Sequence, residues 1–305
     1  MSEFLLSTDK LTKIYGKHKA VNEVSMHVER GAVYGFIGKN GAGKTTFMKI
    51  VAGLANKTSG SYSLFGQTGR AVDQVKSKLG CLIEAPGIYQ RLSAYDNMKT
   101  KCLALGKYDP DYIRELLKLV GLSDTGKKAA GHFSLGMRQR LGIALALIGE
   151  PEMLVLDEPI NGLDPQGIVE VRDIIHRLSV ERGITILISS HILDELSKIA
   201  THYGIINNGS LIRELSADEL AAECASGVDI TVKGAAASAA GVLERMGLSF
   251  SILDADHIRV NGQPERSAEI NAALVTGGYA VSELSLHTAA LEEYYLSLTG
   301  GAQNA

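Results

Sequence analysis

Residues 38–45 read Gly38-Lys39-Asn40-Gly41-Ala42-Gly43-Lys44-Thr45 and match the pattern G-x-x-x-x-G-K-[ST] at every fixed position. A compact apolar run at residues 33–37 precedes this segment, and residues 46–54 have helical periodicity. Strand, glycine-rich loop and helix in this order are typical of a phosphate-binding loop. There, backbone N–H groups converge on phosphate oxygens at the positive end of the helix. A glycine-rich turn without a ligand is the alternative interpretation, and it is less consistent with this context.

The loop also predicts individual roles. Lys44 supplies a mobile positive charge for the phosphates, and the Thr45 hydroxyl reaches Mg²⁺. The residues expected to bind the nucleotide phosphates are Gly38, Lys39, Asn40, Gly41, Ala42, Gly43, Lys44, Thr45 and Thr46.

Two further apolar runs, at residues 153–156 and 184–188, are expected to be strands. Because they are continuous and not alternating, they indicate strands covered on both faces, as in a parallel α/β sheet. The first run ends at Asp157, which can hold the hydration shell of Mg²⁺, and Glu158 can polarise an attacking water. A solvated acidic pair at the start of a loop is the alternative. Between the first two predicted strands, residues 96–148 form a stretch with helical spacing.

Composition excludes several classes of protein. A length of 305 residues allows two domains, and a net charge of −3 lacks the basic footprint of a nucleic-acid-binding protein. The longest stretch without a charged residue or histidine, residues 270–282, is too short to span a bilayer, and the first residues do not resemble a signal peptide. The three cysteines are isolated, which indicates ordinary thiols in a reducing compartment and no metal site.

The sequence changes in character after about residue 216. Strands are expected at residues 229–232, 250–253, 258–260 and 280–286, and helices at residues 236–246 and 267–275. The order β-α-β-β-α-β is that of a small ferredoxin-like α+β unit, and residues 291–298 would add a closing helix.

Residues 5–209 resemble the nucleotide-binding subunits of ABC transporters, because further motifs occur in the order of that family. Those motifs are a signature-like segment Phe133-Ser134-Leu135-Gly136-Met137, a D-loop-like segment Asn161-Gly162-Leu163-Asp164-Pro165, a switch-like segment Ser189-Ser190-His191, and Tyr15 ahead of the phosphate loop. The resemblance implies an α/β P-loop NTPase of ABC type at residues 1–220, with an inserted helical subdomain at about 86–150. Residues 221–305 would form the small C-terminal accessory or dimerisation domain.

The resemblance also implies the cofactors and partners. ATP and Mg²⁺ would lie between two copies of the chain, with Ser134 and Gly136 of one copy closing on the γ-phosphate held by the other. His191 would orient the water that Glu158 activates, and Tyr15 would stack on adenine, although a tyrosine in a β-rich segment can also be a packing residue. A separate transmembrane permease would hold the chain in the cytoplasm, on the inner face of the membrane.

Two positions depart from the common family pattern. Leu135 and Met137 stand where glycine and glutamine are usual, and Glu84 stands where a glutamine usually reaches Mg²⁺. A carboxylate suits Mg²⁺, so Glu84 joins Thr45 and Asp157 as a predicted metal ligand; a misalignment, with Gln90 as the true counterpart, is the alternative. Glu84 and the signature-like segment resemble the ATPases of bacitracin and lantibiotic export systems.

These features predict the ATP-hydrolysing motor of an ABC exporter that confers resistance to a peptide antibiotic. A soluble ABC ATPase acting on ribosomes or nucleic acid is the main alternative, and the single phosphate loop and the −3 charge argue against it. A regulator that binds ATP without hydrolysis is a third possibility, which the presence of Glu158 and His191 disfavours.

Overall fold

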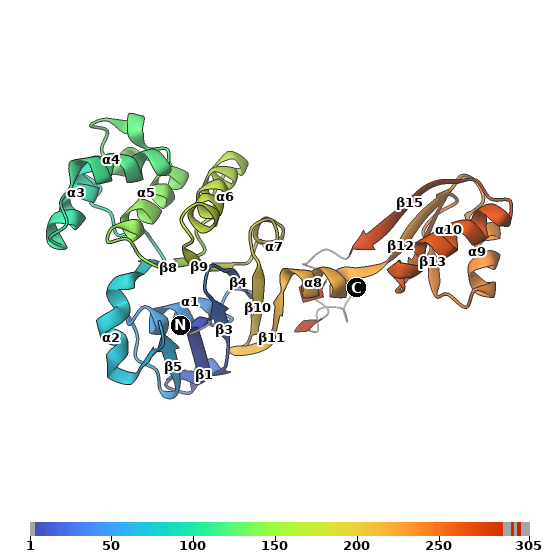
Figure 1. The fold of residues 1–305 in the computed structure, drawn as a ribbon, viewed down its shortest axis with the longest axis horizontal. Coiled ribbons are helices and arrows are strands. Elements are labelled where there is room, and N and C mark those ends of the chain that lie inside the picture. Colours follow the sequence, from blue (N-terminus) through green and yellow to red (C-terminus); the bar gives the residue numbers. More distant parts are fainter. Residues whose placement is uncertain (1–3, 289–293, 296–297, 300–305) are drawn as a thin grey trace. The chain divides into compact units, whose positions relative to one another are not determined.

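The computed structural model describes residues 4–288, 294–295 and 298–299, and the chain divides into two units between Ala217 and Asp218 (Figure 1). Each unit has its own sheets and its own cluster of buried hydrophobic residues. Within the described part of the chain, no helix is both long and apolar enough to cross a membrane.

A six-stranded sheet forms the centre of the first unit. Its strand order is β11-β10-β4-β9-β8-β7, and all neighbours are parallel except β10 and β11. The strands are β4 (Val33–Ile37), β7 (Leu79–Leu82), β8 (Met153–Asp157), β9 (Thr185–Ser190), β10 (His202–Asn207) and β11 (Ser210–Ser216). Every residue of β4, β8 and β9 is buried, which confirms the three strands predicted from continuous apolar runs.

A second, antiparallel sheet of the first unit packs against the same core. It contains β1 (Phe4–Tyr15), β2 (His18–Val24), β3 (His27–Glu29), β5 (Ser59–Leu64) and β6 (Gln67–Thr68). Helix α1 (Lys44–Val51) contributes Phe47 and Met48 to a buried cluster that also contains residues of both sheets, such as Leu6 and Val155. Ala42 of the phosphate-loop segment belongs to the same cluster, so the loop is anchored on this shared core.

The remaining helices of the first unit surround these sheets or lie beyond them. They are α2 (Val72–Val75), α3 (Ala94–Ala104), α4 (Pro110–Leu119), α5 (Leu135–Leu147), α6 (Pro165–Val180) and α7 (Leu193–Leu196), and α8 (Ala217–Cys224) follows at the division between the units. The stretch predicted as helical at residues 96–148 is divided into α3, α4 and α5, which gather at one end of the unit (Figure 1). Gly106 and Gly121 end α3 and α4 with positive φ angles of 67° and 65°, which glycine adopts easily.

The second unit is a four-stranded antiparallel sheet with two helices. Its elements are β12 (Ala225–Val232), α9 (Ala236–Arg245), β13 (Phe250–Ile252), β14 (His257–Asn261), α10 (Ser267–Thr276) and β15 (Val281–Thr288), and the strand order is β13-β14-β12-β15. Val228 and Ile230 pack in one cluster with Leu243 of α9 and Leu274 of α10. The first strand starts earlier than the predicted 229–232, and most of the predicted closing helix at residues 291–298 lies outside the described residues.

Candidate nucleotide-binding site

The phosphate loop connects the end of β4 to the start of α1. Gly41 and Gly43 have φ angles of 83° and 108°, a conformation that residues with a side chain rarely adopt. A Cβ at Gly43 would lie 2.2 Å from the Ala20 carbonyl oxygen, and one at Gly38 would lie 2.6 Å from that of Ile206. Side chains are therefore excluded at the positions where the backbone passes closest to its neighbours.

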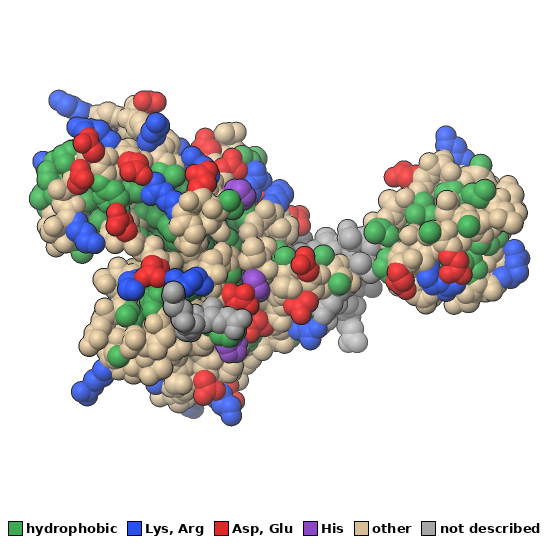
Figure 2. Space-filling view, viewed as in Figure 1, with side chains coloured by type: hydrophobic (Ala, Val, Ile, Leu, Met, Phe, Trp, Pro, Cys, Tyr) green, Lys and Arg blue, Asp and Glu red, His purple; other side chains and the backbone are tan. Residues whose placement is uncertain are grey.

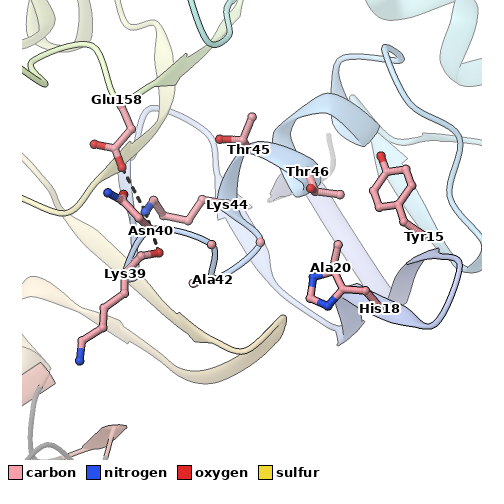
Figure 3. A pocket seen from close by; sticks show the side chains of 12 residues that line it. Tyr15, His18, Ala20, Lys39, Asn40, Ala42, Lys44, Thr45, Thr46 and Glu158 are labelled. Carbon is pink, nitrogen blue, oxygen red and sulfur yellow. Dashed lines mark hydrogen bonds and ion pairs between the residues drawn. The ribbon is translucent and has the colours of Figure 1, made fainter.

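The N-terminus of α1 opens into a cavity of about 320 Å³ (Figure 3). Residues 39–46 line this cavity together with Tyr15, His18, Ala20 and Glu158. Gly43, the N-cap residue, provides no side-chain hydrogen bond to the first turn, and no acidic residue lies in that turn. The helix therefore presents free N–H groups and its positive end to the cavity, which suits the phosphates of a nucleotide.

Lys44 is a buried cation of this cavity, and only 5% of its surface is exposed. Its ammonium donates a hydrogen bond to the Gly38 carbonyl oxygen at 2.5 Å. It also lies 3.1 Å from Glu158 Oε1 (Figure 3). That carboxylate oxygen is buried and accepts no well-aligned hydrogen bond from any described residue. A buried acceptor with no such bond costs free energy unless a ligand or water supplies a donor.

Asp157 is held in place by two hydroxyl groups. Thr45 Oγ1 donates to Asp157 Oδ2 at 2.8 Å, and Ser189 Oγ donates to Asp157 Oδ1 at 2.7 Å. The described residues contain no group of three or more His, Cys, Asp or Glu side chains that could hold a metal ion. Thr45 and Asp157 therefore offer only two neighbouring oxygen ligands. A cation bound there would take its remaining ligands from phosphate oxygens and water, as Mg²⁺ commonly does.

Glu158 is positioned by the backbone and by a histidine. Its φ of 49° is unusual for a residue with a side chain, and its N–H donates to Ser189 Oγ at 2.9 Å. His191 Nδ1 lies 2.7 Å from Glu158 Oε2. The structure therefore brings together the predicted base Glu158 and the predicted switch residue His191 at the ends of β8 and β9.

Tyr15 and His18 face the same cavity from the antiparallel sheet (Figure 3). They are paired across the turn between β1 and β2, and Tyr15 is 49% exposed, so it is not a core packing residue. Lys13 Nζ lies 4.7 Å from the centroid of the Tyr15 ring. Sequence reasoning did not identify His18, and only its place just after Tyr15 could have indicated it.

Ser189 is a further site residue that the sequence does not single out within the switch-like Ser189-Ser190-His191 segment. Its hydroxyl joins the strand ends at Asp157 and Glu158. Its position directly after the apolar run at residues 184–188 was the available signal, since neighbouring parallel strands end at the same edge of the sheet.

Glu84 makes no hydrogen bond to Thr45 or Asp157, the other predicted metal ligands, among the described residues. It follows β7, has a φ of 64° and is paired with Lys49 of α1, with Glu84 Oε1 2.5 Å from Lys49 Nζ. Its side chain is 62% exposed and does not line the cavity. In the alternative residue, Gln90, the backbone carbonyl oxygen accepts a hydrogen bond from the Gly131 N–H. Gln90 does not line the cavity either.

Ser134 and Gly136 lie at the N-terminus of α5 and do not line the cavity of their own chain. Ser134 is the N-cap, and its Oγ accepts a hydrogen bond from the Met137 N–H at 3.2 Å, which confirms that a helix begins there. The neighbouring Leu135 is 39% exposed, and its Cδ2 would lie 3.4 Å from a Cβ placed on Gly162.

Comparisons with known proteins agree on one family. A family model described as ABC transporter matches residues 21–161. The chain is 38% identical over 303 residues to the bacitracin transport ATP-binding protein BcrA of Bacillus licheniformis, covering 99% of each chain. It is 48% identical over 214 residues to the lantibiotic transport ATP-binding protein SrtF of Streptococcus pyogenes, covering 70% of this chain and 92% of that protein. The solved structure of cbiO1 of Clostridium perfringens, part of the ABC transporter complex cbiONQ, is similar with a TM-score of 0.65 and 27% identity, covering 73% of this chain and 92% of that one.

Proposed function

The chain belongs to the ATP-binding subunits of ABC transporters, and from this membership we propose that it drives export of a peptide antibiotic of the bacitracin or lantibiotic type. It is an ATP-binding motor subunit of a family that hydrolyses ATP. One observation carries the proposal at the level of chemistry: a buried Glu158 oxygen without a well-aligned hydrogen bond lies beside a phosphate cradle.

The residues divide the work of hydrolysis as follows. Bound Mg²⁺·ATP supplies the phosphoryl group and the cation that neutralises its charge. The free N–H groups of residues 43–46 and the Lys44 ammonium would hold the phosphates, while Thr45 and Asp157 would hold the cation. Glu158 polarises the attacking water, and His191 fixes the Glu158 carboxylate through its Nδ1 contact. Tyr15, exposed in the cavity, stacks on the base.

A second copy of the chain completes the site. Ser134 and Gly136 stand at a helix N-terminus and lie outside the cavity of their own chain. Their N–H groups therefore remain available to the γ-phosphate held by a partner copy. Two copies arranged head to tail would enclose two ATP molecules.

The two units have different roles in this proposal. Residues 1–220 act as the nucleotide-binding domain, with the helical subdomain at about 86–150 inserted between β7 and β8. Residues 221–305 form the accessory domain, whose β-α-β-β-α-β order supports a ferredoxin-like fold. Stabilisation of the dimer is the proposed role of this second domain.

A separate permease would hold the chain at the inner face of the cell membrane. The antibiotic class comes from the relatives, whose names specify bacitracin transport and lantibiotic transport. Glu84, which stands where the wider family usually has glutamine, is proposed as a ligand of Mg²⁺ that leaves Lys49 when the cation binds. An ATPase acting on ribosomes or nucleic acid is not favoured by these relatives.

The test combines partner capture with resistance measurements. The tagged full-length chain should retain a transmembrane permease in a detergent pull-down. Cells lacking the gene should become more sensitive to bacitracin or to a lantibiotic, and the native gene but not Glu158→Gln should restore resistance. Equal sensitivity of all strains to both antibiotic classes would reject the substrate, and rescue by Glu158→Gln would reject hydrolysis as the driving step.

A further inference from the structure

A second cavity, of about 340 Å³, lies in the first unit at the C-terminal end of α1. It is formed by the end of α1, the loop that follows, strand β5 and the segment from Gly69 to Lys76. Its volume is close to the 320 Å³ of the nucleotide cavity, and it shares no lining residue with that cavity.

Positive charge prevails in this cavity although the whole chain carries a net charge of −3. Lys57, Arg70 and Lys76 line it, against one carboxylate, Asp73. Lys76 Nζ lies 2.6 Å from Asp73 Oδ1, so that pair is neutral. The charges of Lys57 and Arg70 remain, and no hydrogen bond or ion pair joins the Arg70 guanidinium to another residue that the structure describes.

Two neutral side chains of the lining also have spare hydrogen-bonding capacity. The Asn56 amide and the Tyr62 hydroxyl make no hydrogen bond to the part of the chain that the structure describes. Tyr62 is only partly exposed, and its burial raises the pKa of its hydroxyl, so the group keeps its proton and can donate. Ile50, Ala55 and the Tyr62 ring add carbon surface beside these donors.

The absence of a side chain at Gly53 allows the Lys76 ammonium to approach the backbone closely. Gly53 has a φ of 75°, and a Cβ at this position would lie 2.4 Å from Lys76 Nζ. The Lys76 ammonium therefore lies directly against bare backbone at the end of α1. The Lys76–Asp73 pair and Arg70 thus line the same cavity.

We propose that this cavity binds a small anion that carries at least two negative charges on a short carbon skeleton, as a phosphate monoester or a polycarboxylate does. Two uncompensated cations match such a charge, and the amide and hydroxyl donors match its oxygens. This site shares no lining residue with the nucleotide cavity, where the proposed function assigns the phosphates mainly to backbone N–H groups.

The experiment measures binding of citrate and of glycerol 3-phosphate by calorimetry. The full chain is saturated with Mg²⁺·ADP so that the phosphate loop is already filled, and glycerol serves as the uncharged probe. Arg70→Gln and Lys57→Gln each remove one cation from the cavity. Lys118→Gln is the matched control, because Lys118 is an exposed lysine on α4 that does not line the cavity.

At least one anion should bind to the native chain, and glycerol should not. Each cavity variant should weaken that binding about tenfold or more, since a charge-assisted hydrogen bond is lost, whereas Lys118→Gln should leave it unchanged. Preference for glycerol 3-phosphate would identify a phosphate ester as the ligand class, and preference for citrate a polycarboxylate. Absence of binding by both anions, or equal affinity in Arg70→Gln and Lys118→Gln, would overturn the proposal. Neither result would bear on ATP hydrolysis.

Discussion

At the scale of single residues, the nucleotide cavity is organised around the pairing of Lys44 with Glu158. The ammonium lies 3.1 Å from Glu158 Oε1 in a buried setting, where a charge without a partner is costly. Phosphate oxygens would offer Lys44 a stronger partner and would free Glu158 to accept a hydrogen bond from water. If Glu158 is the base, as proposed, this exchange would link ligand binding to its release through one lysine.

Glu158→Gln should retain ATP binding and lose hydrolysis. The amide keeps the size of the side chain but removes the negative charge that polarises water, and general-base catalysis is worth about 100-fold or more. Phosphate release gives the rate, and light scattering gives the mass of the ATP-bound dimer, which should accumulate. Glu181→Gln, an exposed change at the end of α6, is the control. Hydrolysis at the native rate in Glu158→Gln would rule out this residue as the base.

Lys44→Ala should weaken nucleotide binding about tenfold or more, because one charge-assisted contact to phosphate disappears. The measurement is a fluorescence titration with labelled ADP. The comparison is Lys39→Ala, which removes a different lysine of the same loop that also lines the cavity. If Lys44→Ala bound ADP as tightly as the native chain, the phosphate-loop assignment would be wrong.

Glu84→Gln should keep ATPase activity in the isolated subunit, since an amide oxygen can replace a carboxylate oxygen as a ligand. The variant also loses the charge that pairs with Lys49, an exposed pair whose contribution to stability is small. Phosphate release at varied Mg²⁺ concentrations is the measurement. Complete loss of activity at saturating Mg²⁺ would show that the carboxylate itself is required.

At the scale of elements, helix caps distinguish the binding helix from its neighbours. Helices α3, α4, α5 and α6 each begin with a Ser or Asp side chain that accepts a hydrogen bond from the first turn. Helix α1 begins with Gly43 and has no such cap. No side chain accepts a hydrogen bond from the first turn of α1, whereas each of the other four helices has at least one first-turn N–H bonded to its cap residue.

Two cap variants separate stability from function. Asp164→Ala and Asp109→Ala each remove a capping carboxylate, from α6 and α4, and each should lower the free energy of unfolding by about 1 kcal/mol. Asp164 lies in the D-loop-like segment next to Gly162, where it holds the Gly167 N–H at 2.9 Å. Only Asp164→Ala should therefore reduce ATPase activity at a temperature where both variants are folded. Equal ATPase activities of Asp164→Ala and Asp109→Ala would show that Asp164 contributes to the stability of α6 and not to hydrolysis.

At the scale of the whole molecule, the two units each bury their own hydrophobic cluster. The larger cluster joins the parallel and antiparallel sheets around α1, and the smaller one lies between α9, α10 and the four-stranded sheet. Since the nucleotide cavity is lined only by residues of the first unit, ligand binding should stabilise that unit alone.

Calorimetric unfolding should therefore show two transitions, of which one responds to nucleotide. Mg²⁺·ADP at 100 times its Kd should stabilise the first unit by about 2.7 kcal/mol and leave the transition of residues 218–305 in place. Lys44→Ala should reduce this shift. A single transition that moves as a whole would instead show that the two units unfold together.

Much of the fold and of the site follows from local sequence patterns. The strands β4, β8 and β9 were predictable because burial on both faces requires continuous apolar runs. The phosphate loop was predictable because its spacing encodes one strand–loop–helix unit. The division of residues 96–148 into three helices was not predicted, since a helical period alone does not reveal where glycines with positive φ end each helix.

The sequence by itself predicted which residues bind phosphate and activate water, because those proposed roles depend on side-chain chemistry and on spacing within one element. Only the tertiary structure decided which of them meet. It joined Ser189 to Asp157 and Glu158, paired Lys44 with Glu158, and turned Glu84 toward Lys49. These contacts link residues far apart in the chain, and they form only where the ends of neighbouring parallel strands and helix α1 come to the same edge of the sheet.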